Sequence, residues 1–395
     1  MSDRANFLAH VAQTSPAPMG LEIAGGRGVY LEDTAGKRYL DLIAGIGVSA
    51  LGHNHPAVVE AVRDQAGRYL HTLVYGEFVL APQARLAALV SAQLPAGLDN
   101  VYFVNSGAEA TEGAMKLAKR ATGRTEFISA ERSYHGSTQG AASLQYPKDF
   151  TQVFYPLLPA VNHLDFNCFG CLERITERTA AVVLETVQAE WGIRKPDPAW
   201  LRAVRDRCDA TGALLILDEI QAGMGRTGTL FAFEQYGVVP DILLLAKGFG
   251  GGMPLGAFIA RKRVMDLFTE NPVLGHITTF GGHPVSCAAG LATLRTLLDQ
   301  PELIGSVATK EALFHELLVH DRILQVRSAG LWMAVELLGF DEVRAVIAGC
   351  LERGLITDWF LWNERSLRIA PPLIITEAEI REACAIILAA LDDLA

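Results

Sequence analysis

The sequence predicts an α/β fold in which a large lobe is built around a mostly parallel β-sheet and a smaller lobe is α+β. The chain has 395 residues, which is too many for one ordinary hydrophobic core, so we expect two lobes. From about residue 100 to residue 260, short apolar runs alternate with stretches in which apolar residues have helical spacing. This alternation is typical of a parallel sheet that is covered by helices.

The apolar runs of this region are rich in Val, Ile and Leu and do not alternate cleanly with polar residues. Strands that are buried on both faces have this character. The expected strands are Val101–Val104, Glu126–Ser129, Ala181–Glu185, Ala213–Asp218, Ile242–Ala246 and Leu255–Ala260. Between some of them, the spacing of apolar residues predicts helices over Ala108–Ala121 and Trp200–Thr211.

The two ends of the chain have a different pattern. Residues 28–33 and 37–41 flank a turn at Ala35-Gly36, which predicts a hairpin. After about residue 285, long helical patterns precede short strands, which we expect at Ile323–Ser328, Trp332–Leu337 and Leu367–Ala370. We therefore assign residues 1–55 and 285–395 to the small lobe and residues 56–284 to the large lobe.

Composition and charge argue against several classes of protein. Half of the residues are hydrophobic and a fifth are charged, which is the balance of a globular protein. The net charge of −10 argues against a nucleic-acid partner and disfavours binding to anionic membranes. No segment has the ~18 uninterrupted apolar residues of a membrane helix, and residues 1–7 lack the order of a signal peptide. We expect a cytoplasmic protein without a membrane partner.

The cysteines and two of the histidines are candidate metal ligands. The six cysteines are scattered, which is typical of a reduced protein. Cys168 and Cys171 form a lone C-x-x-C without the second pair of a structural zinc site, so we interpret them as incidental thiols. His53 and His55 flank Asn54 just before Pro56, and no third ligand is near, so a structural turn is expected. We predict no metal site.

Polar residues follow several expected strands, where ligands bind in sheets of this kind. Ser106 and Gly107 follow the strand at 101–104 and open a helix, which suits a phosphate group or an ordinary helix cap. Asp218 ends a buried strand, and a carboxylate there is costly unless it pairs with a cation. A protonated pyridine nitrogen would supply that cation, although a helix cap or a metal ligand would also explain an isolated Asp.

Lys247 follows an apolar strand and precedes Gly248 and further glycines. Partial desolvation lowers the pKa of such a lysine and suits it to imine formation, and a surface loop fits this context poorly. Tyr134 could stack on a flat heterocycle, or it could be a core residue. Residues 223–228 match G-x-G-x-x-G, but they lie beyond the strand end and precede a poor helix start. We therefore do not expect a nicotinamide cofactor.

Taken together, these residues resemble the class III aminotransferases, the group that includes acetylornithine and ornithine aminotransferases. The resemblance runs from Gly28 to Leu373. The motifs that carry it are Ser106–Glu112, Leu217–Gln221, Gly225–Gly228, Ala246–Gly248 and Thr278–Gly282. It implies a fold-type I transaminase with a sheet of the seven-stranded type, whose large lobe binds pyridoxal 5′-phosphate (PLP). Such enzymes are usually homodimers with active sites at the subunit interface.

The resemblance also implies a role for each residue of the cofactor site. Lys247 would bind the cofactor covalently and move the substrate proton, while Asp218 would pair with the ring nitrogen. Gln221 would contact the ring hydroxyl and Tyr134 the ring face. The remaining residues of the implied cofactor site are Ser106, Gly107 and Ala108 at the phosphate, Thr279 from the partner subunit, and His135 and Glu185.

On the substrate side, Arg368 matches the arginine that binds the substrate α-carboxylate. Glu190 matches the glutamate that covers this arginine in ω-aminotransferases while an amine donor is bound. The sequence departs from the pattern at Ser137, where acetylornithine and ornithine enzymes usually have an arginine for a glutamate side chain. Trp191 would add bulk beside Glu190, and residues 358–363 are unusually aromatic, which suits an apolar amine if their tryptophans face the pocket.

We therefore predict a PLP-dependent aminotransferase that moves an amino group from an acetylornithine- or ornithine-like ω-amine to a 2-oxo acid such as 2-oxoglutarate. One alternative is a transaminase for a more apolar amine that uses pyruvate. Another is an aminomutase of the glutamate-semialdehyde type, against which Arg368 and Glu190 favour two separate substrates. An inactive PLP-binding protein is a further alternative, and the retention of Lys247, Asp218 and Gln221 argues against it.

Overall fold

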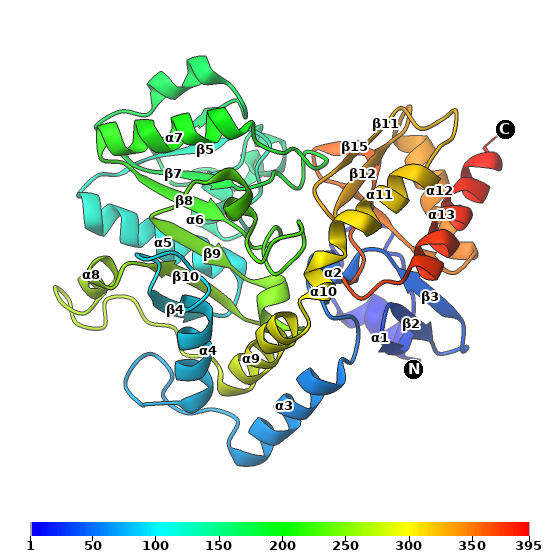
Figure 1. Ribbon diagram of the computed structural model, residues 1–395, viewed down its shortest axis with the longest axis horizontal. Coiled ribbons are helices and arrows are strands. Elements are labelled where there is room, and N and C mark those ends of the chain that lie inside the picture. Colours follow the sequence, from blue (N-terminus) through cyan, green and yellow to red (C-terminus); the bar gives the residue numbers. More distant parts are fainter. Residues whose placement is uncertain (1, 395) are drawn as a thin grey trace.

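The computed structural model describes residues 2–394 and has a large and a small lobe side by side, as Figure 1 shows. A 7-stranded sheet forms the centre of the large lobe, with the strand order β4-β10-β9-β8-β7-β5-β6. Its strands are β4 (Asn100–Val104), β5 (Glu126–Ala130), β6 (Val161–Leu164), β7 (Thr179–Glu185), β8 (Leu214–Asp218), β9 (Ile242–Leu245) and β10 (Gly256–Ala260). The pairs among β5 to β9 are parallel, and only β10 runs antiparallel to its neighbours β4 and β9. The predicted α/β fold with a mostly parallel sheet is confirmed.

Helices cover both faces of this sheet (Figure 1). The helices of the large lobe and of the connection between the lobes are α3 (Pro56–Arg68), α4 (Ala81–Ser91), α5 (Gly107–Thr122), α6 (Gln139–Ser143), α7 (Pro198–Thr211), α8 (Lys262–Met265) and α9 (Pro284–Asp299). Strand β7 is buried along its whole length, and its alternate residues enter two different cores. Ala181 and Val183 pack with α5, whereas Val182 and Leu184 pack with α7, as the two-residue period of a strand requires.

The small lobe joins the two ends of the chain. One sheet has the order β1-β2-β3-β13 and the other has the order β11-β12-β15-β14. These strands are β1 (Ile23–Arg27), β2 (Tyr30–Asp33), β3 (Arg38–Asp41), β11 (Gln325–Ser328), β12 (Met333–Glu336), β13 (Leu355–Ile356), β14 (Asp358–Phe360) and β15 (Asn363–Ile369). Because β3 from the N-terminal part pairs with β13 from the C-terminal part, both ends contribute to one sheet.

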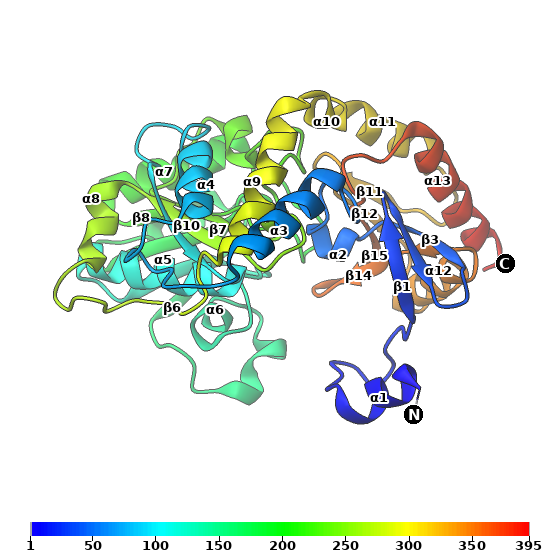
Figure 2. The same ribbon diagram turned by 90° about the horizontal axis from the view of Figure 1, so that it is seen from below.

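The remaining helices are short or lie at the edge of the small lobe. They are α1 (Asp3–His10), α2 (Ala44–Gly47), α10 (Glu302–Gly305), α11 (Val307–Leu317), α12 (Phe340–Glu352) and α13 (Glu377–Asp392). The 3₁₀ segments are η1 (Lys148–Phe150), η2 (Gln152–Phe154), η3 (Phe169–Arg174), η4 (Ala232–Tyr236), η5 (Lys247–Gly250) and η6 (Asp266–Phe268). Figure 2 shows α1 projecting away from the small lobe. Within residues 2–394, no helix is both long and apolar enough to span a bilayer.

Most predicted elements are present, and one strand of the large sheet, β6, was not predicted. The hairpin at residues 28–41 forms from β2 and β3, whose register pairs Tyr30 with Leu40. Strand β6 was not predicted because its sequence, Val-Asn-His-Leu, has no apolar run, and it lies at the edge of the sheet. Residues 223–228 form a loop, and Arg226 donates hydrogen bonds from it to backbone carbonyls of the small lobe, including that of Leu331 at 2.7 Å. The loop is therefore structural.

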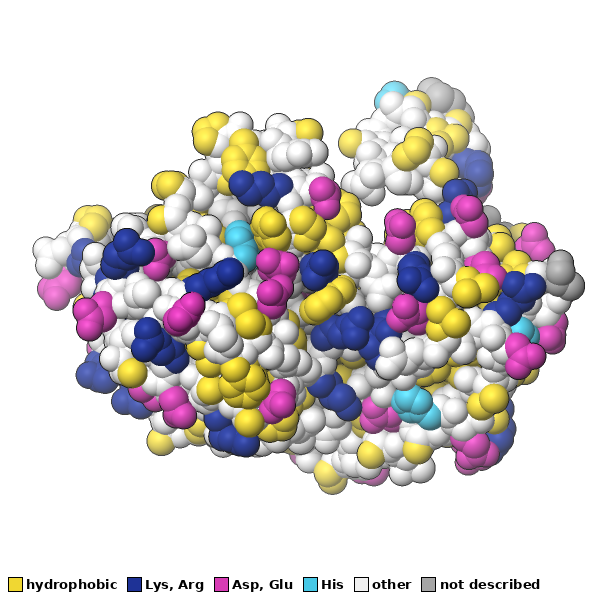
Figure 3. Space-filling model, turned by 90° about the horizontal axis from the view of Figure 1, so that it is seen from above, with side chains coloured by type: hydrophobic (Ala, Val, Ile, Leu, Met, Phe, Trp, Pro, Cys, Tyr) yellow, Lys and Arg dark blue, Asp and Glu magenta, His cyan; other side chains and the backbone are white. Residues whose placement is uncertain are grey.

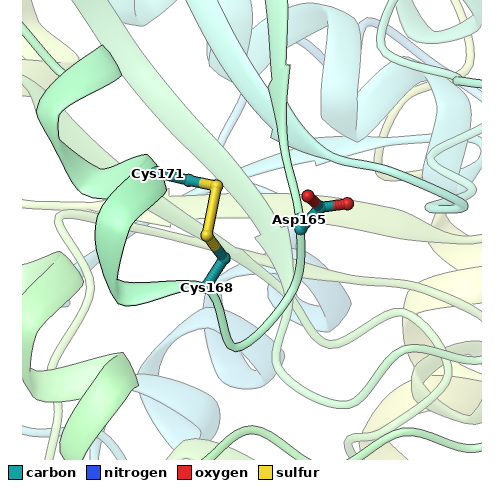
Figure 4. A group of neighbouring side chains, drawn as sticks. All are labelled: Asp165, Cys168 and Cys171. Atoms are coloured by element: carbon teal, nitrogen blue, oxygen red, sulfur yellow. A yellow bond between two sulfur atoms is a disulfide. The ribbon is translucent and has the colours of Figure 1, made fainter.

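The prediction that Cys168 and Cys171 are incidental thiols is wrong. They form a disulfide, which Figure 4 shows beside Asp165. The turn that leads into η3 places their Cα atoms 5.4 Å apart, a separation that a disulfide can span. The other cysteines of the described chain are free and buried. The carboxylate of Asp165 lies within 4.8 Å of both sulfurs, but disulfide sulfurs are not the thiolate ligands that metals bind.

His53 and His55 have separate structural positions. The Nε2 atom of His53 lies 2.9 Å from Oδ2 of Asp41, and its backbone pairs with Gly28. His55 precedes the first residue of α3 as its N-cap. These contacts agree with the expected structural turn.

Candidate active site

Three acidic or basic side chains come from the ends of neighbouring parallel strands. Glu185 ends β7, Asp218 ends β8, and Lys247 follows β9 after one residue. Glu185 and Asp218 are direct partners in the register of β7 and β8, so their side chains begin at the same level of the sheet. A cavity of about 650 Å³ opens at this edge. Its lining includes Ser106, Gly107, Ala108, Tyr134, His135, Glu185, Asp218, Gln221 and Lys247.

Asp218 is fixed by two hydrogen bonds. Its Oδ2 atom lies 2.7 Å from Nδ1 of His135, and its Oδ1 atom accepts from the backbone N–H of Ile220 at 2.9 Å. His135 is only 1% exposed, and its Nε2 atom is buried without a hydrogen-bond partner. The imidazole therefore holds the carboxylate in place from one side and leaves the cavity side of Asp218 free for a cation.

Glu185 lies beside Asp218, and its pKa is strongly shifted. Burial, followed by the negative charge of Asp218, raises the pKa of Glu185 well above its ordinary value. Its carboxyl accepts hydrogen bonds from the backbone N–H groups of Ala189 at 3.0 Å and Tyr134 at 3.2 Å. Glu185 is thus biased toward its neutral form, and Asp218 is the principal negative charge at this end of the cavity.

Lys247 is desolvated and conformationally strained. Burial lowers the pKa of Lys247 to about 8, against the opposing effect of the Glu190 carboxylate. Its φ of 47° lies in the left-handed region, which costs about 1 kcal/mol or more for a residue with a Cβ. A lysine whose amine loses its proton near pH 8 can act as a nucleophile or a base under physiological conditions.

The start of α5 forms a tight cradle at the other end of this cavity. Ser106 caps the helix by accepting from the backbone N–H of Glu109 at 3.1 Å. A Cβ on Gly107 would come within 2.7 Å of Cδ1 of Ile220. Gly136, at a φ of +124°, packs so closely that a Cβ would lie 2.5 Å from Cβ of Ala108. The backbone N–H groups of the first turn can therefore face a bound phosphate at close range.

A second cavity, of about 940 Å³, contains the predicted substrate-binding pair and shares Lys247 with the first. Arg368 of β15 donates from Nη1 to Oε1 of Glu190 at 3.1 Å and from Nη2 to Oε2 at 3.0 Å. Arg368 is 3% exposed, and its guanidinium lies 4.5 Å above the ring of Phe360. Burial raises the pKa of Glu190, but the charge of Arg368, the hydrogen bond from the Leu361 N–H and the charge of Lys247 together outweigh burial, so the net shift is downward. The pair is therefore fully charged.

Asp358 is a second carboxylate beside Arg368, and the sequence did not predict this contact. Its Oδ1 atom lies 3.0 Å from Nε of Arg368, but the two atoms do not have hydrogen-bond geometry. Burial raises the pKa of Asp358 to about 6, against the lowering effect of Arg368. The two residues are direct partners across β14 and β15. Only a correct pairing of these two strands could have predicted the contact.

Comparison with known proteins identifies the family. The family model for aminotransferase class III matches residues 11–391. The chain belongs to this family. The acetylornithine aminotransferase of Methanopyrus kandleri is 43% identical over 365 residues, which are 91% of each chain. The putrescine aminotransferase of Pectobacterium atrosepticum is 40% identical over 91% of this chain and 78% of its own. The protein is thus an aminotransferase that uses PLP to move an amino group from an amine donor to a 2-oxo acid.

Solved structures agree with this assignment. An ornithine aminotransferase from Toxoplasma gondii has a TM-score of 0.90 and 31% identity, and the alignment covers 98% of this chain and 93% of the other. An omega-transaminase from Thermomicrobium roseum has a TM-score of 0.90 and 30% identity over 99% and 97% of the two chains. The fold is therefore that of the PLP-dependent class III transaminases, as the sequence resemblance implied.

The residues of the first cavity fit PLP chemically. The start of α5 suits a phosphate, and the charge on Asp218 suits a protonated ring nitrogen. Gln221 lines the cavity with a buried Oε1 atom that has no hydrogen-bond partner, which suits a hydroxyl donor. The amine of Lys247 suits a covalent bond to the cofactor aldehyde.

Within one chain, Thr279 lies away from this cavity. It is exposed, does not line either cavity, and its backbone carbonyl lies 2.8 Å from Nε2 of His71. It was predicted to act from a partner subunit, and its exposed side chain is accessible to a second chain. The role of Thr279 therefore depends on the assembly of two chains.

The residues that depart from the family pattern have different positions. Ser137 lines both cavities, and its Oγ atom lies 3.0 Å from the hydroxyl of Tyr134. Trp359 lines the second cavity and is 43% exposed, whereas Trp362 packs edge-on against Phe150 at 5.4 Å. Trp191 lines neither cavity, so it does not narrow the substrate site directly.

Proposed function

We propose that the enzyme takes an amino group from an ω-amine of the acetylornithine or ornithine type and transfers it to a 2-oxo acid. The observation that carries this proposal is the doubly hydrogen-bonded pair of Arg368 and Glu190 in the cavity that reaches Lys247. While Glu190 covers the guanidinium, the cavity can hold an amine that has no carboxylate near its reacting carbon. When a 2-oxo acid arrives, its carboxylate replaces Glu190 as the partner of Arg368.

In this proposal, Lys247 is the proton carrier. When bound, PLP supplies a ring that withdraws electrons from the reacting carbon of the substrate. The neutral amine of Lys247 would take the proton from that carbon and, once protonated, would return it on the cofactor side of the substrate nitrogen, which its pKa of about 8 allows. Asp218 keeps the ring nitrogen protonated, and His135 keeps Asp218 oriented through their 2.7 Å contact. Glu185, biased toward neutrality, adds little charge at this point.

A second candidate is transfer from a more apolar amine with pyruvate as the acceptor. Among the described residues that line the two cavities, Lys247 and Arg368 are the only Lys or Arg side chains. Ser137 therefore provides no charge for the second carboxylate of 2-oxoglutarate, whereas pyruvate has none. Phe154 and Trp359 in the lining also favour an apolar amine chain.

A screen of half-reactions tests both candidates. Purified PLP-loaded enzyme is mixed with single amines, and the visible absorbance of the bound cofactor is followed. The absorbance is then restored with one 2-oxo acid at a time. Bleaching by N-acetylornithine or ornithine with recovery by 2-oxoglutarate supports the first candidate. Bleaching by apolar amines alone, with better recovery by pyruvate, supports the second. An absence of bleaching by every amine would contradict both.

We also propose that the enzyme is a cytoplasmic homodimer whose subunits share their active sites. Thr279 belongs to an exposed segment, and its neighbours Ile277 and Phe280 are 46% and 55% exposed. Leu73 and Phe78, which are 41% and 55% exposed, precede α4 and add apolar surface that a second subunit could cover. Sedimentation analysis should give twice the chain mass, and Thr279→Ala should weaken PLP binding without dissociating the dimer. A monomer with full activity would contradict this proposal.

A further inference from the structure

A third cavity, of about 490 Å³, lies outside the active site and has an unusual charge. It is bounded by residues 191–195, by Phe166 and Asn167, and by β11 of the small lobe. Its lining includes Arg194, Lys195 and Arg327 but no Asp or Glu among the described residues. Figure 3 shows Lys and Arg side chains gathered near the middle of one face, where the two lobes meet.

Arg327 is already neutralised, whereas Arg194 is not. Arg327 pairs with Glu336 and donates from Nε to the carbonyl of Gly192 at 2.8 Å. Within residues 2–394, Arg194 has no carboxylate at ion-pair distance, and its Nε atom is buried without a hydrogen-bond partner. Burial, followed by the charge of Arg327, lowers the pKa of Arg194. The Arg194 guanidinium thus lacks the partner that a half-buried cation normally has.

Two guanidinium groups contact the aromatic ring of Trp191, which lines this cavity. Arg132 lies 4.7 Å and Arg194 lies 4.9 Å from the centre of the Trp191 ring. A cation above an aromatic face keeps its forked N–H donors free in the plane of the guanidinium. The cavity therefore presents preorganised donors and positive charge together, and Glu336, which pairs with Arg327, does not line it.

We propose that this cavity binds a small multivalent oxyanion that carries phosphate or carboxylate groups. Forked guanidinium donors match the oxygens of both groups, and charge-assisted bonds of this kind are strong. A volume of about 490 Å³ is larger than inorganic phosphate needs and lies in the range of small-molecule sites. The unpartnered Nε atom of Arg194 would gain its missing acceptor.

The cavity lies next to the segment that carries Glu190. Gln188 and Arg194 exchange two backbone hydrogen bonds of 2.9 Å and so close a short hairpin. Glu190 faces Arg368 from this hairpin, while Trp191 and Arg194 line the third cavity. The proposed oxyanion would therefore bind to the same hairpin as the gate of the active site, at a separate place.

Calorimetric titration of the PLP-loaded enzyme tests this site. Inorganic phosphate and citrate are titrated at a fixed ionic strength set with sodium chloride, and PLP occupies the phosphate cradle at Ser106. We expect saturable binding, and Arg194→Gln should weaken it about tenfold or more because a charge-assisted contact is lost. Arg344→Gln is the matched control, since Arg344 also lies over an aromatic ring, 5.9 Å from Phe340, outside the cavity. The Arg344→Gln enzyme should bind phosphate and citrate with the affinity of the wild type.

The outcomes separate the sources of the oxyanion. Tighter binding of citrate than of phosphate identifies a polycarboxylate, and the reverse order identifies a phosphate group. Equal affinities of Arg194→Gln and the wild type, or no binding beyond that of chloride, would overturn the proposal. Thermal unfolding and the amine half-reaction of Arg194→Gln show whether the variant is folded, since Arg194 does not line the active-site cavities. A second variant, Lys195→Gln, should give a smaller loss of affinity because Lys195 is exposed.

Discussion

The cofactor side and the substrate side of the active site are both lined by acidic and basic side chains, but the two sides differ in which of these groups are charged. Each has two carboxylates, Lys247 lines both cavities, and Arg368 lines only the substrate side. On the cofactor side, the pKa of Glu185 rises and that of Lys247 falls to about 8. On the substrate side, the pKa of Glu190 falls, and Arg368 forms hydrogen bonds of 3.0 and 3.1 Å with it.

This difference shows that contact geometry, and not the inventory of residues, decides which groups are charged. Burial lowers the pKa of Lys247 and, together with the charge of Asp218, raises that of Glu185, because neither group has a closely paired opposite ion. Glu190 is equally enclosed, but its two hydrogen bonds to Arg368 preserve both charges. A proton-transfer group and a carboxylate-binding group are thus made from similar residues within one site.

The largest expected effect concerns the cofactor side. Lys247→Ala should lower turnover by about a thousandfold or more, because it removes the proposed proton carrier. Lys262→Ala is the control, since Lys262 is an exposed lysine that pairs with Asp266. Mass spectrometry after borohydride reduction should find PLP attached to the wild type and to the control but not to Lys247→Ala. Near wild-type turnover of Lys247→Ala would exclude this role.

Arg368→Lys should have the next largest effect, and it should be confined to the substrate side. Lysine cannot make the two parallel hydrogen bonds of a guanidinium, so the KM for the 2-oxo acid should rise about thirtyfold. PLP binding and its absorbance should remain unchanged. Arg365→Lys is the matched control, because Arg365 is an exposed residue of the same strand. An equal rise of this KM in both variants would show that Arg368 affects the site only by stabilising the strand and does not bind the carboxylate.

Asp358→Asn should change the dependence of stability on pH. The pKa of Asp358 is raised from 3.8 to about 6 by burial, so the folded protein holds this proton more tightly than the unfolded chain does. Stability is therefore lost as the pH rises from about 4 to about 6, by about 2–3 kcal/mol. Asp358→Asn should match the wild type near pH 4 and unfold at a higher temperature at pH 8. A variant that is less stable at pH 8 would show that Asp358 stabilises Arg368 instead.

The smallest expected effect comes from the departure at residue 137. Ser137→Arg introduces a cation that faces both cavities and can pair with the second carboxylate of 2-oxoglutarate. The KM for 2-oxoglutarate should fall about tenfold relative to that for pyruvate. A steady-state comparison of the two acceptors measures this ratio. An unchanged ratio would mean that residue 137 does not select the acceptor.

The sequence predicted the cofactor side better than the substrate side for a physical reason. Asp218 and Lys247 follow buried strands of a parallel sheet, and such strands place their ends at one edge, so local patterns suffice. Arg368 and Glu190 come from different lobes, and only the family resemblance connected them. The contact of Asp358 depends on the register of β14, a strand of three residues without a clear pattern. The disulfide of Cys168 depends on a turn whose geometry the C-x-x-C spacing does not specify.

The claim that Glu190 gates Arg368 is tested most directly by measuring the two half-reactions of Glu190→Gln separately. Removing the Glu190 charge weakens the cover on Arg368, so the KM for a simple amine should rise about tenfold, while the KM for the 2-oxo acid should stay equal or fall. Stopped-flow absorbance of the PLP-loaded variant measures each half-reaction separately. This asymmetric result would support Glu190 as the gate of Arg368. Equal losses in both half-reactions would contradict the gate and leave Glu190 as a structural partner alone.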